Sequence, residues 1–350
     1  MSKETQEWLS NYTLIGFTDK RGNAWHWREG DGNHFPDAIP VEVVRERLFF
    51  WEPEEGTVES QVFKNGVFQY KVTNDDRKKI IRPATTQLGD AKILGEFNND
   101  TPMHGYDEWL IGNVQTILHE GLAVASAGLL KGGAQAFVQV ELPETIETPE
   151  GVGFRPYLLA STSLDGSLAT SYNRGNQIVV CDNTMHAALS DKTMQVKVKH
   201  TRYSNTNTKI QDVRDALGII HQEAESFAAE IKELCATEVS NRQWREFLDL
   251  YEPLPEQKPT KGGGPGAGYT RAENRRDKLT NTYLTDFRVA DWTGTAFGVL
   301  QAVNTIQNHD TVIRGGTHRA EKNMLRAIKN EVRDDDVRVL DTLNRVLVAS

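Results

Sequence analysis

The chain has 350 residues, of which 38% are hydrophobic and 25% charged, and this composition is ordinary for a globular protein with one or two domains. Its 40 Lys and Arg residues against 49 Asp and Glu residues give a net charge of −9, which excludes a uniformly basic, histone-like DNA-coating protein. Two cysteines, Cys181 and Cys235, are too few for a disulfide framework or a four-cysteine zinc site. With no export signal and no membrane-length apolar run, we expect a soluble protein of the reducing cytoplasm.

The amino-terminal third mixes aromatic and acidic residues. Residues 1–60 carry six basic and twelve acidic side chains and are expected to form a small β-rich region with a short helix around 41–48. Helical spacing of apolar residues then predicts a helix from Glu108 to Glu120, preceded by Asp107 as its cap.

From Leu122 the pattern changes to short runs of β-forming residues, namely LAVASAGLL, AFVQVELP, FRPYLLASTS, SLATSYNR and QIVVC. Lys131-Gly132-Gly133 and Leu164-Asp165-Gly166-Ser167 stand between them as tight turns, because glycine reaches the positive φ that hairpin turns need. This pattern predicts a meander of antiparallel strands.

After the strands the apolar period becomes helical. Ile210, Val213, Leu217, Ile220, Ala224, Phe227, Ile231 and Leu234 are spaced three and four residues apart, which predicts one long helix of roughly 40 Å. Such a helix lies in the core of a monomer or packs between subunits, and both alternatives stay open. Further helices, with Thr293 and Thr317 as caps, are expected from ENRRDKLTNTYL onward, and the chain ends in a short helix.

These elements together predict an α+β fold: an antiparallel β-meander packed by a long helix, with a helical carboxy-terminal region. We place a small acidic β-rich region at 1–84, the α+β core at 85–251, a flexible Pro/Gly linker at 252–270 and the helical region at 271–350.

A search for catalytic motifs is mostly negative. The glycine cluster 262–266 lacks the Gly-Lys-Ser/Thr end of a phosphate-binding loop, and His119-Glu120 lacks the second histidine of a zinc-protease helix. Asp37 with Glu230 and Lys232 resembles a two-carboxylate nuclease site only superficially, since Glu230 falls within the predicted helix. We assign no catalytic residue, cofactor or metal ligand, and favour a protein that is not an enzyme without excluding one.

Positive charge is concentrated in one stretch of this acidic chain. Residues 192–209 hold Lys192, Lys197, Lys199, Arg202 and Lys209 together with His200, and no acid at all. The stretch is either a solvated surface or a binding site for a polyanion.

The second interpretation has a physical rationale. Alternation in Val196-Lys197-Val198-Lys199 puts both lysines on one face of a strand, and Arg202 and Tyr203 follow directly. A phosphodiester chain suits such a row, because neutralised phosphates release counterions while an aromatic ring stacks on a base. The remaining candidates for this surface are Tyr172, Arg174, Arg271, Arg275, Arg276 and Lys278.

The run RPYLLASTSLDGSLATSYNRGNQIVVCDNTMHAAL, residues 199–201, TKIQDVRDALGI and GTAFGVLQAVNTIQNHD resemble the phage/plasmid-like proteins that carry domain of unknown function 932. The likeness spans roughly residues 85–335 and implies a phage, prophage or plasmid origin without a settled activity. The order of elements in 108–235 is also similar to the core of the phage single-strand annealing proteins, which form rings or helical filaments around a basic DNA groove.

The expected function is therefore a phage-type, oligomeric protein that binds single-stranded DNA and anneals it in recombination or replication, without hydrolysis. Its expected DNA contacts are Lys197, Lys199, Arg202, Tyr203, Lys192, Lys209, Arg174 and Tyr172. A protein-interaction or assembly module that engages a host factor through the acidic amino-terminal region is the alternative, and a metal-dependent nuclease is a third.

Overall fold

The structure is a computed structural model that describes residues 12–20, 32–115, 118, 122–178, 183–185, 195–198, 224–257, 265–312 and 319–348. Eight antiparallel strands of these residues form one sheet in the order β1-β5-β6-β8-β9-β10, with β11 also beside β9 and β7 beside β8. Their bounds are β1 (Thr13–Ile15), β5 (Ala123–Leu130), β6 (Gln135–Glu141), β7 (Ile146–Glu147), β8 (Gly153–Ser163), β9 (Thr170–Ile178), β10 (Asn183–Met185) and β11 (Gln195–Val198). The predicted α+β fold with an antiparallel meander is confirmed.

The central strands are covered on both faces. Every residue of β6 and β8 is buried, because helices lie on each side of the sheet. On one face Val138, Leu158 and Tyr172 pack in a cluster with Trp109 and with Val44 of α2 (Val41–Arg47). The predicted short helix near residues 41–48 is thereby confirmed.

On the opposite face Phe137, Tyr157 and Leu159 pack against Ile328 of α8 (Arg319–Ile328). Alternation along each strand sends successive side chains to the two faces, which is why neighbouring residues such as Phe137 and Val138 belong to different clusters.

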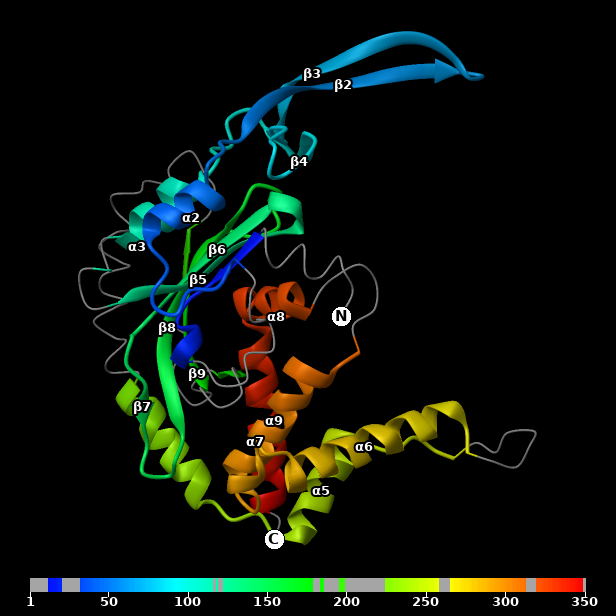
Figure 1. The fold of residues 1–350 in the computed structure, drawn as a ribbon. Coiled ribbons are helices and arrows are strands. Elements are labelled where there is room, and N and C mark those ends of the chain that lie inside the picture. The colour runs from blue at the N-terminus through cyan, green and yellow to red at the C-terminus, as the bar shows by residue number, and fades with distance from the viewer. Residues whose placement is uncertain are drawn as a thin grey trace.

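A second, three-stranded sheet projects from the body as a long arm (Figure 1). It consists of β2 (Glu54–Lys64), β3 (Val67–Arg82) and β4 (Lys92–Asn98), in the order β2-β3-β4. Asn65 and Gly66 join β2 to β3 with φ values of 51° and 79°, the positive pair that a tight type I′ hairpin turn requires. Beyond Arg77, β4 no longer covers β3, so the distal part of the arm is a two-stranded ribbon.

The carboxy-terminal region is helical, and its core also includes Phe154 of β8 and Ile178 of β9. It contains α5 (Asn241–Tyr251), α6 (Ala267–Thr285), α7 (Ala296–Thr305) and α9 (Glu331–Val348). The described part of the predicted long helix, 224–236, joins this core through Ala224, Phe227 and Ile231, as the spacing of three and four residues indicates.

Several local predictions need correction. A π-helical turn, η2 (Asp107–Gly112), replaces the start of the predicted helix, and Asp107 accepts a hydrogen bond from Arg45 Nε at 2.7 Å instead of capping. The cap of α7 is Thr295, whose hydroxyl accepts a hydrogen bond from Gly298 N, and not the predicted Thr293. The Thr293 hydroxyl instead donates to Tyr283 O.

The helices of the carboxy-terminal region also differ in their ends from the sequence prediction. Helix α6 begins at Ala267, inside the predicted linker, and Asn330 at φ 61° separates α8 from α9. Thr317 lies outside the described residues. Among the described helices, none combines the length and the apolar composition that crossing a bilayer requires.

Candidate functional site

The predicted nucleic-acid contacts are only partly within the described residues. Lys192, Lys199, Arg202, Tyr203 and Lys209 lie outside them. The backbone of Lys197 belongs to β11, where it is the Cα partner of Ser171 in β9. In the described part of the sheet β11 has β9 as its neighbour on one side, so the acid-free stretch enters the fold at a border of the sheet.

Tyr172 and Arg174, the other two predicted contacts, belong to the buried interior of β9. The Tyr172 side chain is 1% exposed, and its hydroxyl donates to Trp109 O at 2.8 Å while accepting from Asn113 Nδ2 at 2.5 Å. Burial raises the pKa of Tyr172 to about 12, against a smaller opposing effect of the Asn113 hydrogen bond. Arg174 is 7% exposed. Both side chains therefore serve the packing of the sheet in this conformation.

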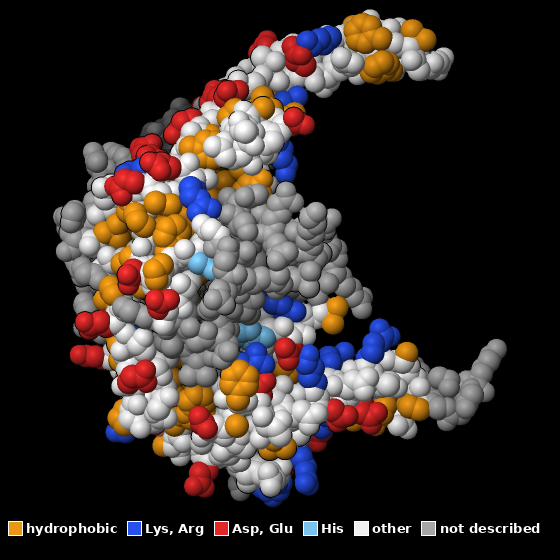
Figure 2. Space-filling view, viewed as in Figure 1, with side chains coloured by type: hydrophobic (Ala, Val, Ile, Leu, Met, Phe, Trp, Pro, Cys, Tyr) orange, Lys and Arg blue, Asp and Glu red, His pale blue; other side chains and the backbone are white. Residues whose placement is uncertain are grey.

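The arm carries charges of opposite sign along its two borders. Strand β2 contains Glu54, Glu55 and Glu59, whereas β4, which lies at the base of the arm nearer the hollow between arm and α6, contains Lys92 and Glu96. Figure 2 shows mainly Asp and Glu along the outer border of the arm and mainly Lys and Arg along the border that faces the hollow. In this view, the border of the arm that faces the hollow is therefore mainly cationic.

Helix α6 presents a second cationic surface toward the same hollow. Its spacing of four and three residues puts Arg271, Arg275 and Lys278 on one helix face, while Glu273 and Asp277 lie on the opposite face. We call these three cations the α6 cationic face. Figure 2 shows Lys and Arg along the edge of α6 toward the arm and Asp and Glu along its other edge.

The cations of α6 form hydrogen bonds and ion pairs that lie at the protein surface. Arg275 Nε donates to Glu252 at 2.8 Å, and Lys278 Nζ lies 3.5 Å from Asp310 Oδ2. Arg271 donates to Ala267 O of its own helix. Exposed ion pairs are worth little, about 0 to 1 kcal/mol, so a phosphate can compete for these cations.

Two glycine-rich turns of the large sheet form the seat of the arm, which we define as residues 131–134 and 164–167. Gly132, Gly133 and Gly166 have φ values of 69°, 93° and 72°. A Cβ at Gly166 would lie 2.8 Å from Phe97 Cε1, and one at Gly133 would lie 3.0 Å from Arg82 Cδ. These glycines therefore satisfy two needs together, a left-handed backbone and close contact with the base of the arm.

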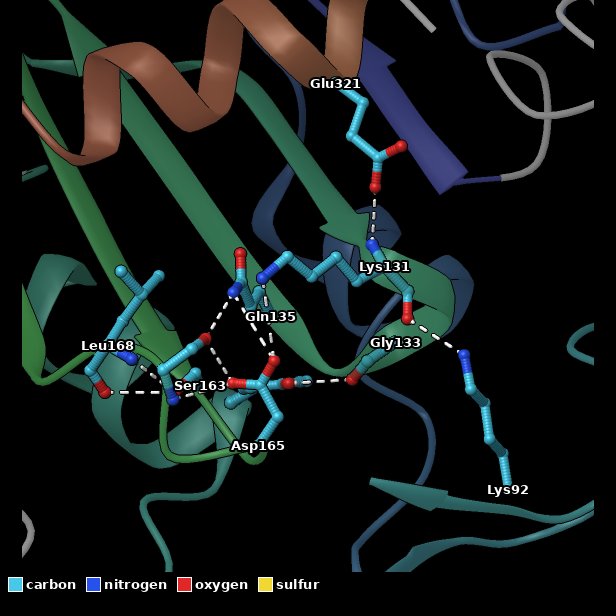
Figure 3. Close-up of polar contacts among 10 residues, drawn as sticks. Lys92, Lys131, Gly133, Gln135, Ser163, Asp165, Leu168 and Glu321 are labelled. Atoms are coloured by element: carbon cyan, nitrogen blue, oxygen red, sulfur yellow. Dashed lines mark hydrogen bonds and ion pairs between the residues drawn. The ribbon is translucent and has the colours of Figure 1, made fainter. Parts of the chain in front are cut away.

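Polar contacts complete the arm seat (Figure 3). The backbone N–H of Lys131 donates to Glu321 Oε1 of α8 at 2.6 Å, and its carbonyl accepts from Lys92 Nζ of the arm at 3.2 Å. Tyr106 donates to Gly133 O at 2.8 Å, and burial raises the pKa of Tyr106 well above its usual value. One turn thus links the sheet, α8 and the arm.

The second turn of the arm seat is held by its own side chains. Asp165 accepts from Ser167 N at 2.9 Å, and its carboxylate lies 3.8 Å from Lys131 Nζ. Gln135, fully buried, donates to Ser167 Oγ at 2.5 Å. Figure 3 shows these side chains converging on Asp165 between the two turns. The cluster fixes the two turns of the arm seat to each other, and within it the Ser167 hydroxyl donates to the Asp165 carboxylate.

The tip of the arm, which we define as residues 60–74, is the feature that the sequence analysis missed. Phe63, Phe68 and Tyr70 are 57%, 52% and 57% exposed there. The signal was present as Asn65-Gly66 between alternating apolar residues, the strongest short-range hairpin pattern.

The other chemistry suggested by the sequence gathers no site in the described residues. No group of three or more His, Cys, Asp and Glu side chains in that part of the chain could hold a metal ion. Ile231, between Glu230 and Lys232, is buried in the helical core. Burial, reinforced by Glu150, raises the pKa of the Cys235 thiol to about 11, which leaves it protonated at neutral pH. Cys181 lies outside the described residues.

Comparison with protein-family models matches residues 108–331 to the family described as "Domain of unknown function (DUF932)". No curated protein and no solved structure matches the chain. The matched region contains both turns of the arm seat, the sheet from β5 onward and the helices through α8, whereas the arm itself precedes it. Since the match covers more than half of the 350 residues, the chain belongs to the DUF932 family.

Proposed function

We propose that this protein binds single-stranded DNA on its concave side and brings complementary strands together without hydrolysing them. The observation that carries the proposal is the separation of charge: a protein of net charge −9 has Lys and Arg on the two edges that face each other across the hollow between the arm and α6. A polyanion is the ligand that such an arrangement attracts, because each neutralised phosphate releases bound counterions.

The α6 cationic face supplies the geometric support. Arg271 and Arg275 are one helical turn apart, about 6 Å along the axis, and Lys278 continues the row. A row of cations without base-reading partners suits a phosphate backbone and predicts binding without strong sequence preference.

The acid-free stretch 192–209 is the second part of the proposed surface. Lys197 stands in β11 at a border of the sheet, and we assign phosphate contacts to Lys197, Lys199 and Arg202, with Tyr203 as a stacking ring. We further propose that the protein acts as a homo-oligomer, since one chain offers only a short row of cations to a long strand.

The test is fluorescence anisotropy of a labelled single-stranded oligonucleotide across a salt series. Replacing Arg271 and Lys278 with Glu should weaken binding and reduce the slope of log K against log salt by about 1.4, because each lost contact to a single strand accounts for about 0.7. The double variant Lys197→Glu, Lys199→Glu should also weaken binding and reduce the salt slope.

The matched control is Lys232→Glu, an exposed cation of the helix 224–236, which lies on the side of the body away from α6 and the arm. This variant makes half the change of charge of each double variant and should leave the salt slope unchanged. A loss of affinity in all three variants that is proportional to their change of charge would mean that net charge alone causes the effect. Absence of binding by the wild type at low salt would refute the proposal.

Annealing and assembly need separate measurements. Mixing two complementary strands, one with a donor and one with an acceptor dye, follows annealing directly, and recovery of intact strands reports hydrolysis. Mass photometry with and without oligonucleotide gives the oligomeric state. Cleavage of the DNA strands in the presence of magnesium or manganese would favour the nuclease hypothesis over the annealing hypothesis.

The outer border of the arm supports a second candidate function, contact with a host protein. Glu54, Glu55 and Glu59 belong to β2, and Glu55 and Glu59 form ion pairs with Lys78 and Lys71 of β3. Acids at this border favour a basic protein partner over DNA. Co-purification that depends on these three residues and persists in the α6 variants would favour this alternative.

A further inference from the structure

The tip of the arm exposes side chains that its own fold does not use. Phe63, Phe68 and Tyr70 are more than half exposed, and Val67 is 62% exposed. Buried aromatic residues stabilise a fold, and these three rings bury too little to do so. We propose that the tip is a stacking site for the bases of single-stranded DNA, an inference that rests on the proposed function and names a contact outside the cationic surfaces.

The charge of the tip selects this ligand. Residues 60–74 contain Lys64 and Lys71 and no acidic residue, although the whole protein has more acids than bases. Lys71 forms an ion pair with Glu59, at the lower end of the tip. Aromatic rings with adjacent cations are the combination by which proteins hold single strands without reading their sequence.

The rings are available on both faces of the ribbon. Phe63 and Phe68 are cross-strand partners and share one face, where their ring centroids are 6.0 Å apart at 72°. Tyr70 is the partner of Val62, one step along β2, and lies on the other face because an extra residue interrupts the alternation of β3 here. A strand can thus meet a ring on whichever side it passes the arm.

The composition of the tip argues against a protein partner as its main occupant. Lysine is depleted in the buried centre of protein interfaces, whereas here Lys64 and Lys71 directly follow Phe63 and Tyr70 in the sequence. Lysines on the border strands of a sheet also oppose pairing of the arm with the arm of a second copy.

The position of the tip fits the same strand that the α6 cationic face would hold. The arm and α6 project from the body toward the same side, with the hollow between them (Figure 1). The arm seat fixes the base of the arm through Phe97, Arg82 and Lys92.

The experiment compares two ligands of equal length and charge, an oligothymidylate and a phosphodiester chain of abasic units. The wild-type protein should prefer the oligothymidylate, by about tenfold for each ring that carries a base. The triple variant Phe63→Ala, Phe68→Ala, Tyr70→Ala should lose this preference and keep its affinity for the abasic chain. Because all three side chains are exposed, the variant should fold, which its unfolding curve in urea verifies.

Ile93→Ala is the matched control, since Ile93 is an exposed apolar residue of the arm, 56% exposed, that lies outside the tip. It should keep the wild-type preference for bases. A triple variant that retains the preference would overturn this inference and leave the proposed function standing. Wild-type protein that binds neither ligand would refute the proposed function, and a triple variant that changes the mass of the free protein would make the tip a contact between copies.

Discussion

The large sheet and the arm are both antiparallel, yet they bury their residues in opposite ways. All eleven residues of β8 are buried, whereas the ribbon of β2 and β3 exposes apolar side chains on both faces. Packing explains the sequence of β8, because each face meets its own cluster of helices. Packing does not explain the exposed apolar residues at the tip of the arm. Residues without a packing role are therefore the first candidates for binding.

The same aromatic residue occurs in both regions and gives the sharpest test of this comparison. Phe137→Ala in β6, at 1% exposure, should lower the free energy of unfolding by about 3 to 5 kcal/mol, since it removes buried surface and leaves a cavity. Phe68→Ala in β3, at 52% exposure, should cost less than about 1 kcal/mol. Unfolding in urea, followed by circular dichroism, measures both.

Similar losses in the two variants would contradict the division into a packed sheet and an unpacked arm. In particular, a loss of several kcal/mol for Phe68→Ala would mean that another part of the chain or a second copy covers the tip in solution. Repeating the measurement at a tenfold lower protein concentration separates these two cases, because only contact between copies depends on concentration.

Two glycines with similar backbones extend the comparison to the turns. Gly166 in the arm seat and Gly66 at the tip have φ values of 72° and 79°, so alanine is strained at both by about 1 to 2 kcal/mol. At Gly166 a Cβ also meets Phe97 at 2.8 Å, whereas at Gly66 no atom lies within 4 Å. Gly166→Ala should therefore cost about 1 kcal/mol more than Gly66→Ala in urea unfolding.

Equal costs at the two glycines would mean that the base of the arm moves away from its seat without penalty. Amide hydrogen exchange in β4 provides an independent reading. Loosening of the seat should raise exchange in β4 for Gly166→Ala and leave it unchanged for Gly66→Ala.

The same contrast explains what could be predicted from the sequence. The meander was predictable because hydrophobic runs of strand length alternate with glycine turns such as Lys131-Gly132-Gly133, so local signals and packing agree. The described part of the long helix was predictable from its spacing of three and four apolar residues. In both cases burial imposes a period that the sequence displays.

Other features depend on contacts that no local pattern encodes. Asp107 resembles a helix cap but pairs with Arg45, 62 positions away. Tyr172 resembles an exposed stacking ring beside Arg174, yet it hydrogen bonds to Trp109 O across the core. Charge patterning identified Arg271, Arg275 and Lys278, whereas their position opposite the arm follows only from the fold.

Tyrosine provides the smallest of the expected differences between the two regions. Burial raises the pKa of Tyr172 to about 12, above the value of about 10 in the unfolded chain. The folded state therefore holds this proton more tightly, and the resulting stability is complete below pH 10 and lost as the pH rises through 12. Tyr172→Phe removes this dependence, so the fall in unfolding free energy between pH 9 and pH 11.5 should be smaller than in the wild type by about 1 to 2 kcal/mol.

Tyr70→Phe is the control from the arm, because it makes the same chemical change on a ring that is 57% exposed. At pH 8 Tyr172→Phe should already be less stable than Tyr70→Phe, since it loses the hydrogen bonds to Trp109 O and Asn113. This difference in unfolding free energy should narrow at high pH. The Tyr70→Phe variant still contains Tyr172, which ionises on unfolding, whereas the Tyr172→Phe variant has no proton to lose at this position. A gap that stays constant with pH would mean that solvent reaches Tyr172, and the sheet would then resemble the arm more closely than its packing indicates.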